Sequence, residues 1–86
     1  MAYYQNQKLG ELPKHHHKDD QRWLNEKLGY LDEETRSKIC NAYSRAFREA
    51  EHAEPNENKK SNRARFAANS RLRIFLKKRF AVFNRS

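Results

Sequence analysis

The sequence has one cysteine, two glycines and two prolines, and no long apolar run. The single thiol, Cys40, excludes an internal disulfide and a cysteine-based zinc cluster, and it suits a reducing compartment. Neither Gly10 nor Gly29 is followed by Lys-Ser or Lys-Thr, which argues against a phosphate-binding glycine loop. No stretch is long and apolar enough to cross a bilayer or to act as a secretory signal. We therefore expect a cytoplasmic protein.

Residues that could act in catalysis are also scarce. Cys40 falls beside Ile39 on an expected helix and is more simply a packing residue than a nucleophile. Asp19 and Asp20 are adjacent and project in different directions, so they do not suit an acid–base pair. Three consecutive histidines at 15–17 alternate in direction in an extended chain and have no regularly spaced carboxylate or cysteine, which favours a solvated run. We expect no enzymatic activity, no metal site and no cofactor.

Positive charge is what the sequence has in excess, and it is concentrated near the C-terminus. Residues 56–86 contain ten lysines and arginines and one acid, a net charge of +9, whereas residues 1–55 have nine basic and ten acidic residues, a net charge of −1. The net charge of +8 therefore comes from the last third of the chain. A field concentrated on one element attracts polyanions, whereas scattered charge mainly keeps a protein soluble.

The apolar periodicity predicts an all-α fold. We expect a small three-helix domain at 19–86, with a short first helix and two long antiparallel helices, and a flexible N-terminal arm at 1–18. The helices are expected at about 19–29, 32–54 and 58–82.

Local signals set these limits. The Asp19-Asp20 pair can cap the first helix, Gly29 can end it, and Asp32 can cap the second. Pro55 ends the second helix because it disfavours helical geometry in the residue before it. Trp23, with Leu24 and Leu28 at helical spacing, is expected to anchor the core.

The last helix should be amphipathic. Its apolar stripe has ordinary width for a core-facing helix and comprises Ala64, Ala68, Leu72, Phe75, Leu76, Val82 and Phe83. The stripe should pack on the face of the second helix marked by Ile39, Tyr43, Ala46, Phe47 and Ala50. Arg65 and Arg79 project near the stripe, so they must extend to its edge or meet an acidic partner from the preceding helix. Phe66 and Ile74 fall among the basic residues, either as scattered surface apolar groups or, for the ring, as a platform for a base.

The opposite side of this helix is the candidate nucleic-acid-binding surface. It comprises Lys59, Lys60, Arg63, Arg71, Arg73, Lys77 and Lys78. Ser61, Asn62, Asn69 and Ser70 could add hydrogen bonds to phosphates or bases. A helix-turn-helix reading of residues 19–45 is less favoured, because Asp32, Glu33 and Glu34 would then face the phosphates.

The runs DDQRWLNEKLGYLDEETRSKICNAYSRAFREA and EPNENKKSNRARFAANSRLR resemble short proteins of temperate phages and prophages of enteric bacteria. The resemblance covers most of residues 18–73. It implies a bacterial host cell and an accessory role on DNA or on host replication, recombination or transcription machinery. It identifies no functional residues.

Three binding functions stay open. Nucleic acid, most simply DNA, is the first. The second is an acidic protein partner, such as a host nucleic-acid enzyme. The apolar tail Phe80, Ala81, Val82 and Phe83 supports this function and could equally support a homodimer. The third, a membrane surface, is disfavoured because the apolar face is needed to cover the other helices.

Overall fold

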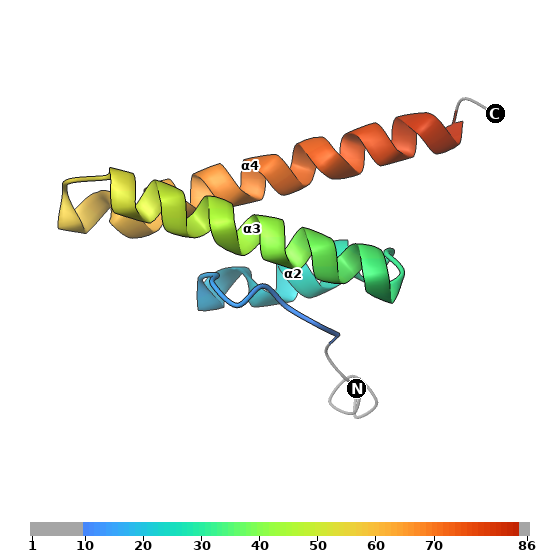
Figure 1. Ribbon diagram of the computed structural model, residues 1–86, viewed down its shortest axis with the longest axis horizontal. Coiled ribbons are helices and arrows are strands. Elements are labelled where there is room, and N and C mark those ends of the chain that lie inside the picture. Colours follow the sequence, from blue (N-terminus) through green and yellow to red (C-terminus); the bar gives the residue numbers. More distant parts are fainter. Residues whose placement is uncertain (1–9, 85–86) are drawn as a thin grey trace.

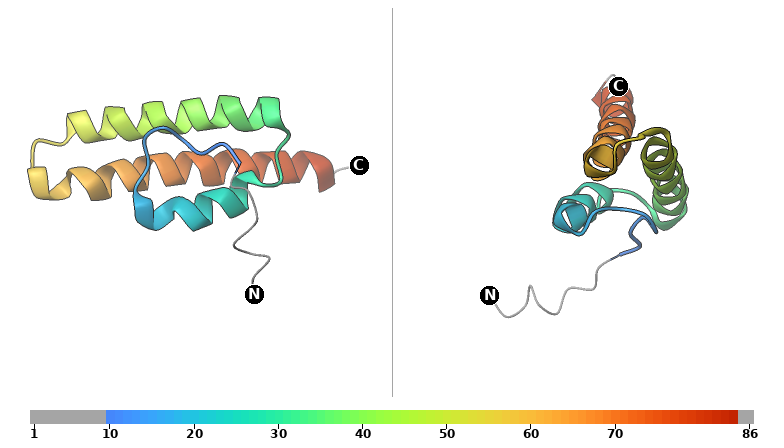
Figure 2. Two further views of the ribbon diagram at one scale, coloured as in Figure 1. Left: turned by 90° about the horizontal axis from the view of Figure 1, so that it is seen from below. Right: turned by 90° about the vertical axis from the view of Figure 1, so that its left-hand side faces the viewer.

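The computed structural model describes residues 10–84, and all regular structure in this range is helical. A 3₁₀ turn, η1 (Lys18–Asp20), leads into α2 (Gln21–Leu28), and α3 (Glu33–Ala53) and α4 (Glu57–Asn84) follow. The two long helices lie side by side and antiparallel, and α2 lies against them so that the three form a triangle seen end-on (Figures 1 and 2). The all-α class, with a short first helix and two long antiparallel ones, is confirmed.

The limits of α3 follow the expected signals. The Asp32 carboxylate accepts a hydrogen bond from the Thr35 amide at 3.2 Å, which caps the free end of the helix. Glu54 is extended, with φ −87° and ψ 115°, as a residue before proline prefers to be. Asn56 then accepts from the Asn58 amide at 2.9 Å, so α4 begins at residue 57.

The first helix begins differently from the expectation. Asp20 occupies its N-cap position, but the side chain makes no capping hydrogen bond. Its carboxylate instead binds Arg65 of α4. The capping prediction for Asp20 is therefore wrong, because a bidentate contact with arginine competes for the same oxygens and is the stronger interaction.

The core is built mainly from small and aliphatic side chains. Along α4, Ala64, Ala68, Leu72 and Leu76 are buried at four-residue intervals. From α2, Leu24 and Leu28 are 0% and 1% exposed. The remaining buried apolar residues are Leu31, Cys40, Tyr43, Ala46 and Phe47, with Leu12, Trp23, Ile39 and Phe75 packed partly buried against them. The side chains of Val82 and Phe83 lie outside the described part of the structure.

Trp23 does not anchor this core. Its ring is partly buried at the edge, while the neighbouring Leu24 fills the centre. The expectation was wrong because helical spacing groups residues on a face without saying which of them points at the helix junction. The larger ring takes the rim, where one side stays accessible to an arginine from α4.

The described part of the arm, residues 10–17, lies along α3. Pro13 is fully buried, the His15 amide donates to Ser44 Oγ at 3.1 Å, and Arg36 Nε donates to the Glu11 carbonyl at 2.7 Å. α3 therefore has a second buried face, at Cys40 and Ser44, beneath the arm. Residues 1–9 of the predicted arm lie outside the described residues.

Candidate nucleic-acid interface

The structure separates the cations of α4 into two groups. The inner group contacts acids or carbonyls of the preceding elements, and it consists of Lys60, Arg63, Arg65 and Arg79. The outer group is exposed to solvent, and it consists of Lys59, Arg71, Arg73, Lys77 and Lys78.

Two inner cations close the α3–α4 hairpin. Lys60 Nζ donates to the carbonyl oxygens of Glu51 at 3.0 Å and Glu54 at 2.6 Å, which satisfies acceptors left open at the C-terminus of α3. Arg63 Nε lies 3.1 Å from the Glu54 carboxylate. Two of the seven predicted binding residues thus make hydrogen bonds within the protein.

Arg65 joins α4 to the start of α2. Its Nε and Nη2 donate to the two Asp20 carboxylate oxygens at 2.9 and 2.8 Å. Asn69 Nδ2 donates to the same carboxylate at 3.2 Å, and the Tyr43 hydroxyl donates to Asn69 Oδ1. The hydrogen bond from Arg65 holds the pKa of Asp20 below its usual value, and the carboxylate raises the pKa of Arg65 in turn.

This polar network gives Arg65 an acidic partner, as expected, but the acid comes from the N-cap position of α2 and not from the preceding helix, α3. The network also removes Asn69 from the candidate binding surface, because both ends of its amide are used inside the domain. Arg79, the other cation that projects near the apolar stripe, lies 3.9 Å from the Asp32 carboxylate at the start of α3. The acids that face α4 are therefore matched with its inner cations.

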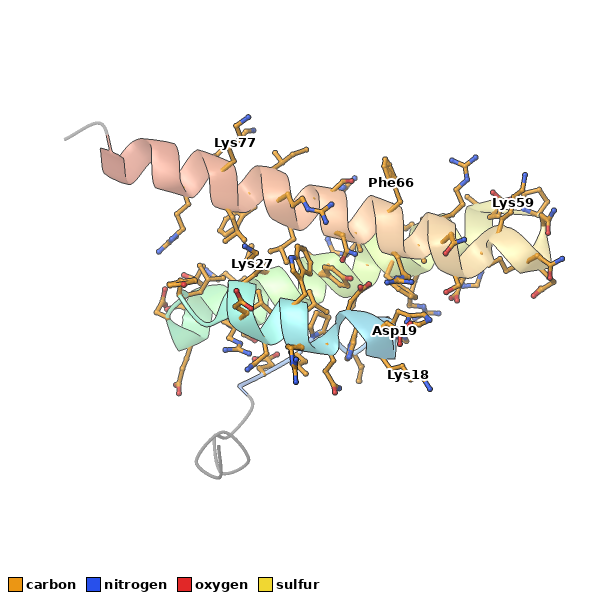
Figure 3. All side chains as sticks on the ribbon, turned by 180° about the vertical axis from the view of Figure 1, so that it is seen from behind. Lys18, Asp19, Lys27, Lys59, Phe66 and Lys77 are labelled. Carbon is orange, nitrogen blue, oxygen red and sulfur yellow. The ribbon has the colours of Figure 1, made fainter. Side chains whose placement is uncertain are left out.

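The outer group covers the exposed side of α4, which we call its outer face. Lys59, Arg73 and Lys77 fall within roughly 40° of one another at 100° per residue, and Arg71 and Lys78 lie further round the helix. Figure 3 shows Lys77 and Phe66 projecting from the side of α4 that faces away from α2. Among the described residues, none of these five cations forms an ion pair. From Lys59 to Lys78 this surface is roughly 28 Å long.

Two large apolar side chains lie among these cations, as expected. Phe66 is 64% exposed and Ile74 is 55% exposed. Ser61 and Asn62 are exposed as well, while Ser70 is half-buried.

A hollow of about 620 Å³ opens between α2 and α4, beside Arg73. Trp23, Lys27, Tyr30, Arg73 and Leu76 line it. The Arg73 guanidinium lies over the Trp23 ring, 5.0 Å from the ring centre, and Tyr30 is 76% exposed. Of these residues, the sequence pattern assigned only Arg73 to binding, because the loop residue Tyr30 carries no periodic signal and Lys27 lies on another helix.

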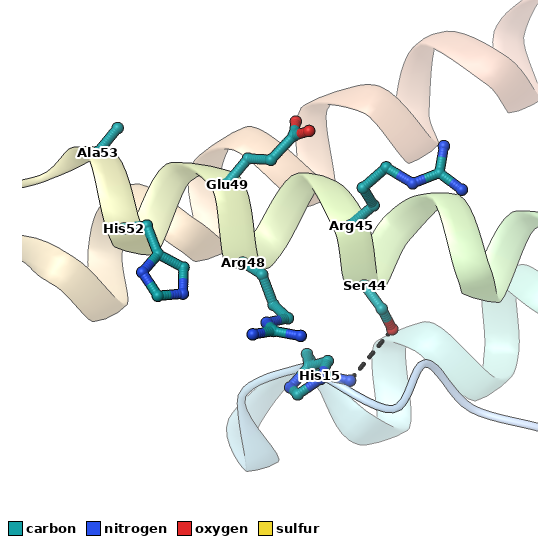
Figure 4. A pocket seen from close by; sticks show the side chains of 7 residues that line it. All are labelled: His15, Ser44, Arg45, Arg48, Glu49, His52 and Ala53. Carbon is teal, nitrogen blue, oxygen red and sulfur yellow. Dashed lines mark hydrogen bonds between the residues drawn. The ribbon is translucent and has the colours of Figure 1, made fainter.

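A second basic group lies on the face of α3 that carries the arm (Figure 4). A second hollow here is lined by His15 of the arm and by residues of α3 that include Arg45, Arg48, Glu49 and His52. Arg48 and His52 project on the side of α3 where His15 lies, whereas Arg45 and Glu49 project away from His15. The spacing of Arg45, Arg48 and His52 places them on one helical face, which could have been noticed from the sequence. The position of His15 beside them could not have been predicted from the sequence, because the path of the arm is set by tertiary contacts. Glu49 offsets part of this charge, so the face is less basic than the outer face of α4.

Within the described residues, no helix is long and apolar enough to cross a membrane. In the same part of the chain, no group of three or more His, Cys, Asp or Glu side chains is arranged to hold a metal ion. No protein-family model, curated protein or solved structure matches this chain.

Proposed function

We propose that this protein is a non-catalytic nucleic-acid-binding accessory protein that uses the outer face of α4. The observation that supports this is the sorting of charge. Asp20, Asp32 and Glu54 face the inner cations, which leaves Lys59, Arg71, Arg73, Lys77 and Lys78 exposed and without an acidic partner among the described residues. Phosphates are attracted to such a surface, and each neutralised phosphate releases counterions.

DNA is the polymer we expect, in the cytoplasm of a bacterial host cell. The resemblance to short phage and prophage proteins supports a role beside DNA replication, recombination or transcription. The free, buried thiol of Cys40 suits a reducing compartment. We expect the outer face to meet phosphates, so binding at this surface should depend little on base sequence.

The test is fluorescence anisotropy of labelled duplex DNA, single-stranded DNA and RNA at several salt concentrations. We expect micromolar or tighter binding whose logarithm falls linearly with log salt, at a slope of about −0.9 per phosphate neutralised on duplex DNA. Arg71→Glu combined with Lys77→Glu should weaken binding at least tenfold and make the slope shallower by about 2.

The matched control is Arg22→Glu combined with Lys38→Glu. Both residues are exposed and lie outside α4, and Lys38 makes only an exposed i,i+4 pair with Glu34. The control changes the net charge by the same amount, so equal losses in the two double variants would show that overall charge, and not the α4 face, governs binding.

An acidic protein partner is the second candidate, and the exposure of Phe66 and Ile74 among cations favours it. Protein interfaces use such apolar contacts, whereas phosphates do not. Absence of binding to any nucleic acid at low salt would overturn the first proposal and assign the basic face to such a partner.

A further inference from the structure

The hollow beside Arg73 brings together aromatic rings and positive charge. Trp23 and Tyr30 give it aromatic walls, and Lys27 and Arg73 give it positive charge. Leu76, which is 8% exposed, is the buried apolar side chain among its lining residues. Its volume of about 620 Å³ is in the range of small-molecule sites.

No acidic side chain lines this hollow, which decides what class of ligand it suits. An aliphatic ligand would leave the two cations without a partner, and a metal cation would be repelled by them. A planar ligand attached to a phosphate matches both features, because its ring can stack on aromatic groups while the phosphate meets Lys27 or Arg73.

The contact between Arg73 and Trp23 places a cation over an aromatic ring beside this hollow. The guanidinium carbon lies 5.0 Å from the centre of the indole ring. Bases stack on arginine planes as well as on aromatic rings, so both groups offer a base a surface to stack on. Lys77, one helical turn beyond Arg73, connects the hollow to the outer face of α4.

We infer that this hollow binds an unpaired base of a single-stranded nucleic acid, by stacking against Trp23, Tyr30 and the Arg73 guanidinium. The inference rests on the proposed function and adds to it a preference for single strands over duplexes. The bases of a duplex are already stacked on one another, so only a single strand or an unpaired end can place a base here. The outer face alone would accept either form.

The test uses intrinsic fluorescence, because Trp23 is the single tryptophan of the chain. An unlabelled deoxythymidine oligonucleotide is titrated into the protein and compared with a duplex of the same length. We expect the single strand to change the tryptophan emission and to bind more tightly than the duplex. Tyr30→Ala should lower single-strand affinity at least fivefold. Since Tyr30 is exposed, its removal should leave helical circular dichroism intact.

Phe66→Ala tests the competing site, because Phe66 is an exposed ring on α4 that lies outside the hollow and could itself stack a base. Single-strand affinity should stay within about twofold of the unmodified protein in this variant. Loss of affinity in Phe66→Ala but not in Tyr30→Ala would overturn the inference and assign stacking to Phe66.

The two proposals fail in different ways. Salt-dependent binding of duplex and single strand with equal affinity, without a change in tryptophan emission, would overturn the hollow as a base site and support the outer face as a phosphate surface. No binding of either polymer would overturn both.

Discussion

Arg65 of α4 holds the Asp20 carboxylate with two hydrogen bonds, at 2.9 and 2.8 Å, across 45 residues of sequence. The pair joins the start of α2 to the middle of α4 and is extended by Asn69 and Tyr43. The Asp20 and Arg65 side chains are 12% and 31% exposed, so water screens the interaction only partly. This contact positions the first helix and gives an acidic partner to a cation that projects near the apolar stripe of α4.

Asp20→Asn should therefore destabilise the domain by roughly 2 kcal/mol at pH 7, measured by urea unfolding. The pKa of Asp20 is lowered mainly by the hydrogen bond from Arg65, so the folded state favours the charged carboxylate. This stabilisation is present above the usual pKa of 3.8 and is lost as the pH falls through the lower folded-state value. The difference between the variant and the unmodified protein should therefore shrink below about pH 4.

Asp19→Asn is the control for this prediction. Asp19 is adjacent in sequence, but its side chain is 63% exposed and lies 3.6 Å from His17 Nδ1, while the hydrogen bonds of Arg65 go to Asp20. Its removal should change stability by less than about 0.5 kcal/mol. Equal destabilisation by the two variants would show that local charge at η1, and not the contact with Arg65, carries the effect.

Neighbouring residues of α2 test where the core lies. Leu24→Ala should cost about 2–5 kcal/mol and leave little folded domain, because Leu24 is fully buried. Trp23→Ala should cost less and retain a cooperative thermal transition by circular dichroism, because the ring lies at the rim. Unfolding by Trp23→Ala alone would place the core around the indole after all.

The thiol of Cys40 should be protected in the folded protein. Burial raises its pKa to about 11, and the thiol lies 3.5 Å from the Glu11 carbonyl beneath the arm. Only about one thiol in a thousand is then ionised at pH 8, and the thiolate is the reactive form. Reaction with a disulfide reagent at pH 8 should be at least 100-fold slower than in urea. Rapid native labelling would show that the arm does not cover Cys40.

Local chemistry accounts for what could be predicted of the fold. Asp32 and Pro55 delimit α3, because capping and the restriction before proline depend on adjacent residues. The four-residue spacing of Ala64, Ala68, Leu72 and Leu76 identified the buried side of α4. The exposure of Phe66 and Ile74 followed from the same periodicity.

The features that could not be predicted depend on contacts between residues that are distant in sequence. The burial of Pro13 depends on where the arm crosses α3, and the pairing of Asp20 with Arg65 depends on how α2 lies against α4. The hollow around Trp23 and Tyr30 likewise depends on how α2 lies against α4. Helical periodicity reports the face of one helix and carries no information about which face of another helix meets it.

Lys59 and Lys60 are adjacent cations that the structure uses differently, so together they test how the charge of α4 is divided. Lys60 reaches the carbonyls of Glu51 and Glu54, whereas Lys59 is exposed on the outer face. Lys60→Ala should destabilise the domain by about 1 kcal/mol in urea unfolding and leave the salt dependence of DNA binding unchanged. Lys59→Ala should leave stability unchanged and make the salt slope shallower by about 1.

Each of the two variants serves as the control for the other, because both remove one positive charge from the first turn of α4 and both introduce alanine. An effect of overall charge would reduce DNA affinity equally in the two. A loss of helix stability would lower both unfolding midpoints. Only a division between a lysine that closes the hairpin and a lysine that meets phosphate produces opposite results in the two measurements. Equal salt slopes for the two variants would therefore contradict the assignment of the outer face.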